Sequence, residues 1–441
     1  MGKEMLDIAK QALQLAKQKG AAEVASKTSL EREVTVSWRD GKLEKISEAS
    51  TRRLDVDLYV DGRYTSMSTS DLRPEAIGSF LDNAIGLTRT LSPDTNRSLP
   101  APALYEGQAR VDLELEDPRH SALTAVDRRT KAQAIEAAAR TVKGSDAIIS
   151  VTTAFYDGHL ETYRVHSNGF EGSQNSTYYS AFAEASVRDP SGRRPEDYDT
   201  VTVRFYGDLP DVAQLGRSAA ERALGSVGAK KIPSAVTSVI VDNRAAGSLL
   251  RRMMGALNGN ALQQKRSFLE GKLGATIGSR LLSIDDDPLL PRALGSRLYD
   301  GEGIAARKRP VFEGGALKSF FIDTYYGKKL KVDPSSGSAS NLTWKLGSKG
   351  QEALLKDMKN GVLITSWLGG NSNDTTGDFS LGFKGFAVRN GVIAEPIAEM
   401  NLSGNHLETW KKLVAVGNDP YLYSSNRTPT LVFEKLQVAG T

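Results

Sequence analysis

Residues 34–62, VTVSWRDGKLEKISEASTRRLDVDLYVDG, decide the fold of the first half of the chain. Apolar and polar side chains alternate on either side of Asp40-Gly41, and the apolar positions are Val34, Val36, Trp38, Leu54, Val56, Leu58 and Val60. A period of two is typical of a strand with one buried face, and Asp-Gly between two such runs is a strong hairpin signal. Asp61-Gly62 repeats that signal, so the stretch predicts a β-meander.

Helical patterns flank the meander. Apolar residues recur near helical spacing in the opening stretch, which predicts an amphipathic helix that ends at Gly20. A second helix is expected over residues 74–90, with Asp71 as its N-cap. Residues 91–118 contain four prolines and little periodicity, so they predict a loop or strap that crosses the domain.

Strand patterns return over residues 146–204. Turns are expected at Asp157-Gly158, at Asn168-Gly169 and over residues 190–194, because glycine, proline and aspartate interrupt the apolar runs there. Two further helices are expected on either side of these strands, over residues 128–143 and 211–224.

Residues 229–235 resemble a linker, and the pattern changes after them. A short buried strand is expected over 236–241 and a helix over 244–257; glycine turns then punctuate short strands, which favours a mainly antiparallel β unit. Short helices are expected over 325–330, 351–358 and 407–413. We therefore predict an α+β chain with an N-terminal helix-plus-meander domain over 1–230 and a mainly β C-terminal domain over 231–441.

Composition excludes several classes of protein. The 441 residues carry a formal net charge of +4 from 57 basic and 53 acidic side chains, which is too balanced for a nucleic-acid-binding face. The absence of cysteine excludes disulfides and thiolate chemistry. No apolar run has the length of a signal-peptide core or of a membrane helix. We expect a cytoplasmic protein that contacts neither membrane nor DNA directly.

The four histidines do not form a metal motif. None is paired at the spacing of His-Glu-x-x-His or His-Glu-x-x-x-His, so no two ligands project from one helical face beside a glutamate. His159 and His166 flank a predicted hairpin and could approach each other across strands, but two ligands fall short of a zinc site. We expect all four, namely His120, His159, His166 and His406, to lie on the surface.

Other polar clusters favour ordinary solvated surfaces. The acidic run Asp285–Asp287 lacks the spacing and glycine of a calcium loop. The basic clusters Arg251-Arg252 and Arg307–Arg309 are small. Serines are abundant over residues 335–340, but no Gly-x-Ser-x-Gly elbow is present, and a Ser-His-Asp triad could come only from distant parts of the chain.

Three stretches of the C-terminal half resemble a known family. They are Leu298-Tyr-Asp-Gly-Glu-Gly-Ile304 with Phe312–Leu317 and Asp323–Leu330, then Thr376-Gly-Asp-Phe-Ser-Leu-Gly382 with Gly385–Gly391, and finally Pro396–Asn405 with Val416-Gly-Asn-Asp419. Together they resemble the TldD/PmbA family, also called modulators of DNA gyrase, over roughly residues 236–441. The N-terminal helix and meander fit the more variable first domain of that family.

The family that the chain resembles has two arms, the zinc-binding TldD-like chains and the TldE/PmbA-type chains. TldD-like chains carry His-Glu-x-x-x-His on a helix, with a downstream cysteine, and bind a catalytic zinc. Here the corresponding helix contains Ser248-Leu-Leu-Arg-Arg-Met-Met-Gly255, without histidine or glutamate. The resemblance therefore implies a TldE/PmbA-type chain with no catalytic or metal-binding residues and no cofactor of its own, and with zinc in its partner.

The implied function is that of a supporting subunit in a cytoplasmic metallopeptidase that degrades or processes unfolded and leader peptides. The partner would be a TldD-like zinc-binding chain, or a second copy of this chain. Peptide could add to a sheet edge near Gly377, Asp378 and Ser380, although a plain β-turn has the same composition. The alternatives are an autonomous metallopeptidase with unrecognised ligands, and a binding protein that modulates DNA gyrase.

Overall fold

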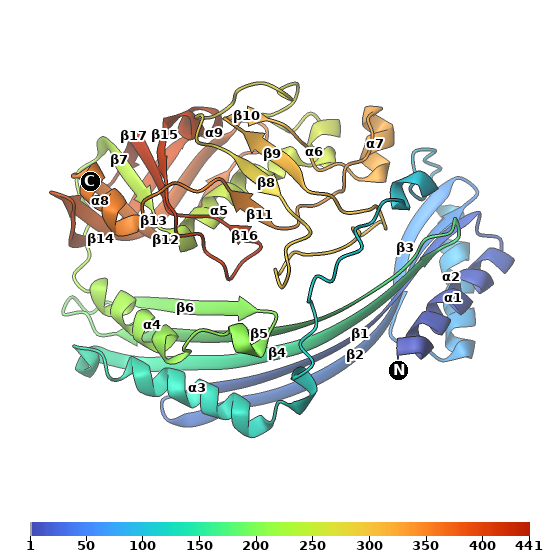
Figure 1. The fold of residues 1–441 in the computed structure, drawn as a ribbon, viewed down its shortest axis with the longest axis horizontal. Helices are drawn as coiled ribbons and strands as arrows, with labels where there is room; N and C mark the ends of the chain where they lie inside the picture. Colours follow the sequence, from blue (N-terminus) through green and yellow to red (C-terminus); the bar gives the residue numbers. More distant parts are fainter. Residues whose placement is uncertain (1) are drawn as a thin grey trace.

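A long curved sheet forms the N-terminal half of the computed structural model, which describes residues 2–441 (Figure 1). Its six antiparallel strands follow the order β3-β2-β1-β4-β5-β6. Asp40-Gly41 and Asp61-Gly62 close the first two hairpins. The φ angles are 47° at Asp40 and 76° at Gly41, and 49° at Asp61 and 73° at Gly62, which are the positive angles of type I′ turns. The predicted meander is confirmed. The strands are β1 Glu23–Arg39, β2 Lys42–Val60, β3 Arg63–Thr69, β4 Ile148–His166, β5 Glu171–Val187 and β6 Glu196–Val203.

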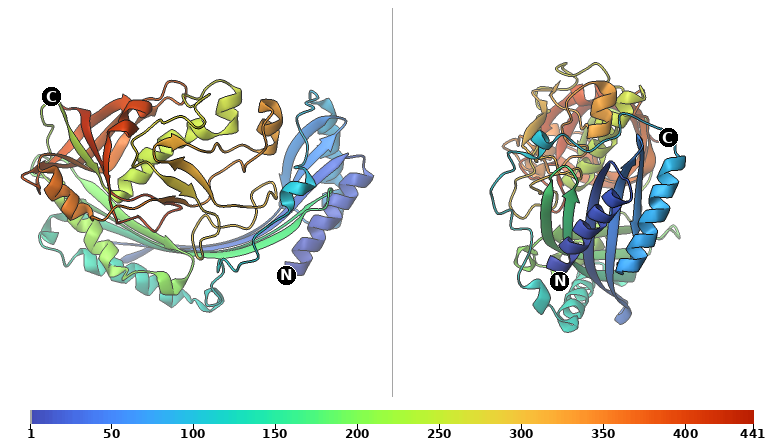
Figure 2. Two further views of the ribbon diagram at one scale, coloured as in Figure 1. Left: turned by 45° about the horizontal axis from the view of Figure 1, so that its top comes forward. Right: turned by 90° about the vertical axis from the view of Figure 1, so that its right-hand side faces the viewer.

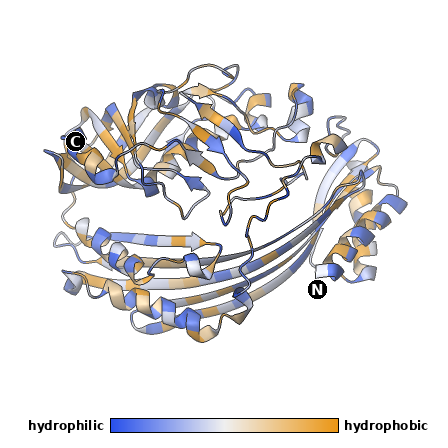
Figure 3. Ribbon diagram, viewed as in Figure 1, coloured by the Kyte–Doolittle hydropathy of each residue, from blue (hydrophilic) through white to orange (hydrophobic). Residues whose placement is uncertain are grey.

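Four helices cover the convex face of this sheet in two pairs. The first pair packs on one end around a core that includes Leu58 and Val165, and the second pair packs on the other end around Phe155 and Tyr179 (Figures 1 and 2). Apolar and polar residues alternate along the long strands (Figure 3), so the concave face is left polar. The helices are α1 Gly2–Gln18 and α2 Pro74–Thr90 in the first pair, and α3 Ala125–Ala139 and α4 Ala213–Gly225 in the second.

Two local predictions in this half are wrong. Asp71 does not cap α2: the N-cap is Arg73, without a side-chain bond, and the Asp71 carboxylate accepts from the Arg73 N–H instead. Asp157-Gly158 forms no turn, because β4 runs through it. The reason is tertiary: Asp157 is fully buried, and a Cβ on Gly158 would lie 2.4 Å from the Tyr178 ring, so glycine makes room for a neighbouring strand.

α3 begins three residues before its predicted start. Thr124 is its N-cap, and the Thr124 hydroxyl and the Asp127 carboxylate form a reciprocal capping box. This signal is present in the sequence and identifies the helix start better than the alanine-rich pattern does. Turns at Asn168-Gly169 and over residues 190–194 are confirmed.

The strap over residues 91–118 is also confirmed. It contains only a short 3-10 turn, Pro102–Tyr105, and it bonds to both halves of the chain (Figure 1). Leu104 and Leu113 carbonyls accept from the N–H groups of Ala305 and Arg292, while the Leu115 carbonyl accepts from Thr177 N–H. The strap thus fixes part of the C-terminal half against the N-terminal sheet.

The C-terminal half is mainly antiparallel, as predicted, and contains two sheets. One has the order β14-β13-β12-β7-β17-β15, and an additional pairing of β14 with β17 closes five of these strands into a ring. Only β7 and β12 run parallel within it. Its strands are β7 Ala235–Val241, β12 Gly361–Ser372, β13 Asp378–Arg389, β14 Val392–Asn405, β15 Leu413–Val416 and β17 Leu431–Ala439.

The second sheet of this half has the order β10-β9-β8-β11-β16 and shares one large apolar core with the ring and with α5. The strands are β8 Ile284–Asp286, β9 Arg309–Glu313, β10 Ala316–Leu317, β11 Leu342–Trp344 and β16 Asn426–Arg427. The helices are α5 Asn243–Met254, α6 Gly259–Gln263, α7 Thr324–Leu330, α8 Gln351–Met358 and α9 His406–Thr409. No helix within residues 2–441 is long and apolar enough to cross a membrane.

Candidate functional site

Helix α5 is the position at which the family resemblance implies metal ligands. Asp242 caps it by accepting from Arg244 N–H at 2.9 Å. One face, which includes Leu249, Leu250 and Met253, is buried in the C-terminal core. The other face presents Ser248, Arg251 and Arg252, and Arg252 Nη1 donates to the Gly370 carbonyl at 3.3 Å.

These side chains do not fit a zinc ion. Zinc takes neutral imidazole, thiolate or carboxylate ligands, whereas the open face of α5 carries hydroxyl and guanidinium groups. Across residues 2–441, no group of three or more histidine, aspartate or glutamate side chains is arranged to hold a metal.

The histidines are not the surface residues that we expected. His120, His166 and His406 are buried, with exposures of 6%, 5% and 0%. His159 and His166 lie on the same strand, seven residues apart and therefore on opposite faces of the sheet. They therefore cannot bind the same metal ion.

His120 and His159 lie side by side instead, with ring centroids 5.9 Å apart. His120 Nε2 lies 2.9 Å from Asp157, and His159 Nε2 lies 2.8 Å from Glu116. Burial acts to raise the pKa of Asp157, but bonds from Arg128 and His120 outweigh it and hold the pKa below its usual value. Each of the two histidines therefore contacts its own carboxylate, Asp157 for His120 and Glu116 for His159.

A serine and a histidine from distant stretches do meet in the C-terminal half. Ser372 Oγ lies 3.0 Å from His406 Nε2, and Trp410 Nε1 donates to His406 Nδ1 at 3.3 Å. Because Nδ1 accepts, the proton of a neutral imidazole is on Nε2, which then donates to the serine. A general base needs the opposite arrangement. This pair therefore lacks the geometry of an activated nucleophile.

Gly377, Asp378 and Ser380 lie where β13 begins. Gly377 has φ of 82°, and a Cβ there would lie 3.1 Å from Phe268. Asp378 accepts from Asn405 Nδ2 at 2.9 Å, and Ser380 Oγ donates to Asn401 Oδ1 at 3.1 Å. Both side chains are exposed.

A peptide cannot add as a strand to β13 itself at these three residues. β13 pairs with β12 on one side and with β14 on the other over this stretch, so its backbone has no free edge. The structure does not test whether the exposed side chains contact a substrate, and that part stays a prediction.

A free strand edge is present elsewhere, on β5. Its outer neighbour β6 pairs with it only from Tyr179 to Ser186. At Thr177 the strap takes over: Thr177 N–H donates to the Leu115 carbonyl at 2.9 Å, and Arg204 Nη1 donates to the Thr177 carbonyl at 3.1 Å. Backbone groups change sides with a period of two, so those of Asn175 and Ser173 point to the same edge. Within residues 2–441 they have no backbone partner there.

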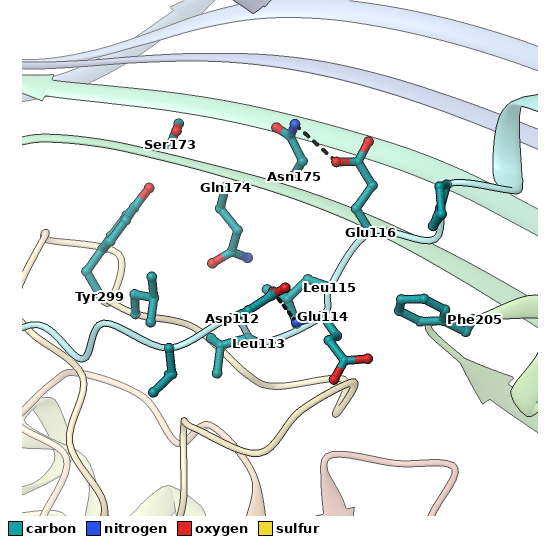
Figure 4. A pocket seen from close by; sticks show the side chains of 13 residues that line it. Asp112, Leu113, Glu114, Leu115, Glu116, Ser173, Gln174, Asn175, Phe205 and Tyr299 are labelled. Carbon is teal, nitrogen blue, oxygen red and sulfur yellow. Dashed lines mark hydrogen bonds between the residues drawn. The ribbon is translucent and has the colours of Figure 1, made fainter.

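A cleft of about 510 Å³ lies beside these groups, between β5 and the strap (Figure 4). Val111, Phe205 and Tyr299 supply apolar walls. Three carboxylates of the strap also line it, namely Asp112, Glu114 and Glu116.

The carboxylates of the cleft differ in their partners. Glu114 is paired with Arg292 at 2.7 Å, and Glu116 with His159. Asp112 accepts from Glu114 N–H, and no basic side chain of the described chain lies within 4 Å of it. The cleft therefore offers backbone donors and acceptors, apolar walls and an uncompensated negative charge.

The sequence of the strap contains a signal for this cleft. In Val111–Asp117 the leucines alternate with acidic residues, and Leu113 and Leu115 are buried while Asp112 and Glu116 are exposed. That period of two is typical of an extended segment with one buried face.

Comparison with known proteins identifies the family. Residues 31–88 match the model of PmbA/TldA metallopeptidase domain 1, residues 118–227 match the central domain, and residues 234–440 match the C-terminal domain. The chain belongs to the PmbA/TldD family.

Relatives of the PmbA/TldD family match along nearly the whole chain. Metalloprotease PmbA of Escherichia coli O157:H7 is 28% identical over 438 residues, which cover 97% of this chain and 94% of that protein. A metalloprotease of Methanothermobacter thermautotrophicus is 27% identical over 413 residues, covering 90% and 88%.

Two solved structures of the same fold extend the comparison. A protein of Bacteroides thetaiotaomicron, provisionally described as a modulator of DNA gyrase, is 38% identical with a TM-score of 0.96 and coverage of 99% and 98%. TldE of Thermococcus kodakarensis has a TM-score of 0.87 at 20% identity, with coverage of 98% and 100%, a likeness of fold. The chain is thus a metallopeptidase-family protein whose α5 does not offer zinc ligands.

Proposed function

We propose that this chain is the noncatalytic subunit of a metallopeptidase complex and holds peptide while a zinc-binding partner cleaves it. Membership of the PmbA/TldD family and the relatives named metalloprotease support the peptidase part of the proposal.

The composition of α5 carries the noncatalytic part. The zinc-binding arm of the family is expected to place two histidines and a glutamate on this helix. Here the open face carries Ser248, Arg251 and Arg252, and α5 contains no histidine and no acidic residue. Restoring a site would require replacement of several side chains, so the metal and the hydrolytic water are assigned to the partner.

The β5 edge supports the peptide-holding part. An extended peptide that lies in the cleft could donate to and accept from Ser173 and Asn175 as an added strand. Such bonds involve only the backbone, so they are indifferent to sequence, as holding of unfolded or leader peptides requires. The uncompensated Asp112 carboxylate of the strap would favour positively charged side chains.

The partner is assigned as a TldD-like zinc-binding chain, with a second copy of this chain as the alternative. The concave face of the N-terminal sheet is polar, and a hollow of about 350 Å³ on it is lined by charged side chains, which include Lys27, Arg53, Asp55 and Arg164. A partner seated over this face would enclose a wet space that suits an unfolded chain. The expected cytoplasmic location stays a prediction.

Metal analysis and peptide hydrolysis test the proposal. The purified chain is assayed alone and after mixing with a TldD-like chain from the same organism, and the matched control is that partner with the glutamate of its His-Glu-x-x-x-His replaced by glutamine. We expect no stoichiometric zinc and no activity alone, activity on mixing, and none with the control partner. Stoichiometric zinc with activity in the isolated chain would overturn the noncatalytic assignment and favour an autonomous metallopeptidase.

The alternative outside peptidase function is a binding protein that modulates DNA gyrase. Its support is the description of structural neighbours such as the Bacteroides protein. Capture of gyrase by the purified chain at physiological salt, with no peptidase activity on mixing, would favour that role.

A further inference from the structure

Three polar stretches that are distant in the sequence meet at one pocket of the C-terminal half. They are the acidic run Asp285–Asp287, the basic cluster Arg307–Arg309 and the serine-rich loop 335–340. The pocket has a volume of about 460 Å³. The expectation that the acidic run is a solvated turn is wrong, since Asp286 and Asp287 are 3% and 8% exposed.

Positive charge dominates the lining. One carboxylate, Asp286, faces the pocket together with four cationic side chains, Arg297, Arg307, Lys308 and Arg309. Lys308 Nζ is neutralised from outside the lining by Asp285 at 3.3 Å and Asp287 at 3.2 Å.

The single lining carboxylate is already engaged. Asp286 Oδ1 accepts from Ser340 N–H at 2.7 Å, and its other oxygen lies 3.4 Å from Arg309 Nε. Arg297 donates to the Ser338 carbonyl at 2.6 Å, and within the described chain no carboxylate lies within 4 Å of it. Only Arg309, of these two guanidinium groups, therefore has a carboxylate partner.

Two nitrogen atoms of these arginines have no partner in residues 2–441. They are Arg297 Nε and Arg309 Nη2, and both are buried. Buried charged donors normally find an acceptor, because their desolvation is costly. Burial lowers the pKa of the Arg309 guanidinium and the nearby Arg297 charge lowers it further, while the Asp286 and Asp300 carboxylates act in the opposite direction.

We propose that this pocket binds a small oxyanion, the carboxylate or phosphate group of a ligand, between Arg297 and Arg309. Planar guanidinium forks match the paired oxygens of both groups and donate charge-assisted hydrogen bonds to them. Ser335 and Ser336 line the same pocket and add hydroxyl groups. The site is separate from the β5 cleft, so it does not depend on the peptide-holding proposal.

Isothermal titration calorimetry on the full chain tests the site at constant ionic strength. The probes are sodium phosphate, tri-alanine with a free carboxylate, and tri-alanine amide, which differs from the second probe in its end group. We expect saturable binding of phosphate, of the free-acid peptide, or of both, and none of the amide. Binding of phosphate alone would assign an inorganic or phosphorylated ligand, and binding of the free acid alone a peptide end.

Variants distinguish the pocket from nonspecific binding. Arg297→Gln removes the arginine that has no carboxylate partner and should weaken binding at least about tenfold; Arg297→Lys, which keeps the charge but loses the fork, should retain part of the affinity. Arg129→Gln, on the exposed face of α3, is the matched control and should bind as the wild type does. Thermal melts check that each variant folds. Absence of binding by the wild type, or equal affinity in Arg297→Gln and Arg129→Gln, would overturn the proposal.

Discussion

Thr177 and Leu115 are joined across the edge of the N-terminal sheet, where the Thr177 N–H donates to the Leu115 carbonyl at 2.9 Å. This bond marks the end of a free edge. β6 stops pairing with β5 at Tyr179, and the strap pairs with one further residue of β5, Thr177. Beyond it, the backbone groups of Asn175 and Ser173 face the cleft.

Removal of one backbone donor from that edge should weaken peptide binding. In Asn175→Pro the N–H that faces the cleft is lost while the ladder to β4 remains, and we expect the affinity for a labelled, extended, basic peptide to fall by about tenfold. Asn175→Ala keeps the N–H and is the matched control. Fluorescence anisotropy measures both variants. Equal affinities in the two would show that the peptide does not add to this edge.

A variant of Asp378 tests the second candidate location for substrate contact, at the start of β13. Its carboxylate is exposed and accepts one bond from Asn405, so Asp378→Ala should cost the fold no more than about 1 kcal/mol. If the side chain contacts substrate, the KM of the mixed complex should rise by about tenfold. Partner-dependent proteolysis that is unchanged in this variant would remove Gly377, Asp378 and Ser380 from the substrate site.

Ser372→Ala should leave the activity of the mixed complex unchanged. The hydroxyl accepts from His406 rather than losing a proton to it, and His406 is fully buried. Peptide hydrolysis under saturating partner measures the effect. Loss of activity without loss of assembly would instead identify a serine nucleophile.

Acid should destabilise the chain through two histidines. Burial lowers the pKa of His166 to about 3 and that of His406 to about 4, against 6.5 for an exposed imidazole. Below pH 6.5 the unfolded chain therefore binds more protons than the folded chain does. As the pH falls from 6 to 4.5, each histidine should reduce the free energy of unfolding by about 1.4 kcal/mol per pH unit. The full contribution is present above pH 6.5.

Urea denaturation at several pH values measures that slope. His406→Gln should reduce this slope by the equivalent of about one bound proton, and the double variant with His166→Gln by the equivalent of about two. Parallel slopes in the wild type and the double variant would show that other groups cause the acid sensitivity.

A glycine in α4 should prove irreplaceable for packing. A Cβ on Gly216 would lie 1.9 Å from the Ile135 carbonyl oxygen of α3, so Gly216→Ala should destabilise the fold by about 1–3 kcal/mol. Gly86, in the middle of α2, meets nothing within 4 Å, and Gly86→Ala should stabilise by up to about 1 kcal/mol. Thermal or urea unfolding measures the pair. Equal shifts in the two variants would contradict the close contact of α3 and α4.

Features with a local origin were predictable from the sequence. Asp40-Gly41 and Asp61-Gly62 specify their hairpins because both turn residues tolerate positive φ, and α2 and α8 have the predicted bounds, 74–90 and 351–358. The absence of histidine and glutamate from α5 is also evident from the sequence alone. In each case the decisive interactions lie within a few residues of one another.

Only the tertiary structure decided where the chain can bind ligands. β4 continues through Gly158 because Tyr178 of the next strand fills the space, and the edge of β5 is free because β6 is shorter than its neighbour. Asp286, Arg309 and the serine loop meet although more than twenty residues separate each from the next. Such features depend on strand lengths and on packing between distant segments, and neither a local pattern nor an intrinsic propensity encodes them.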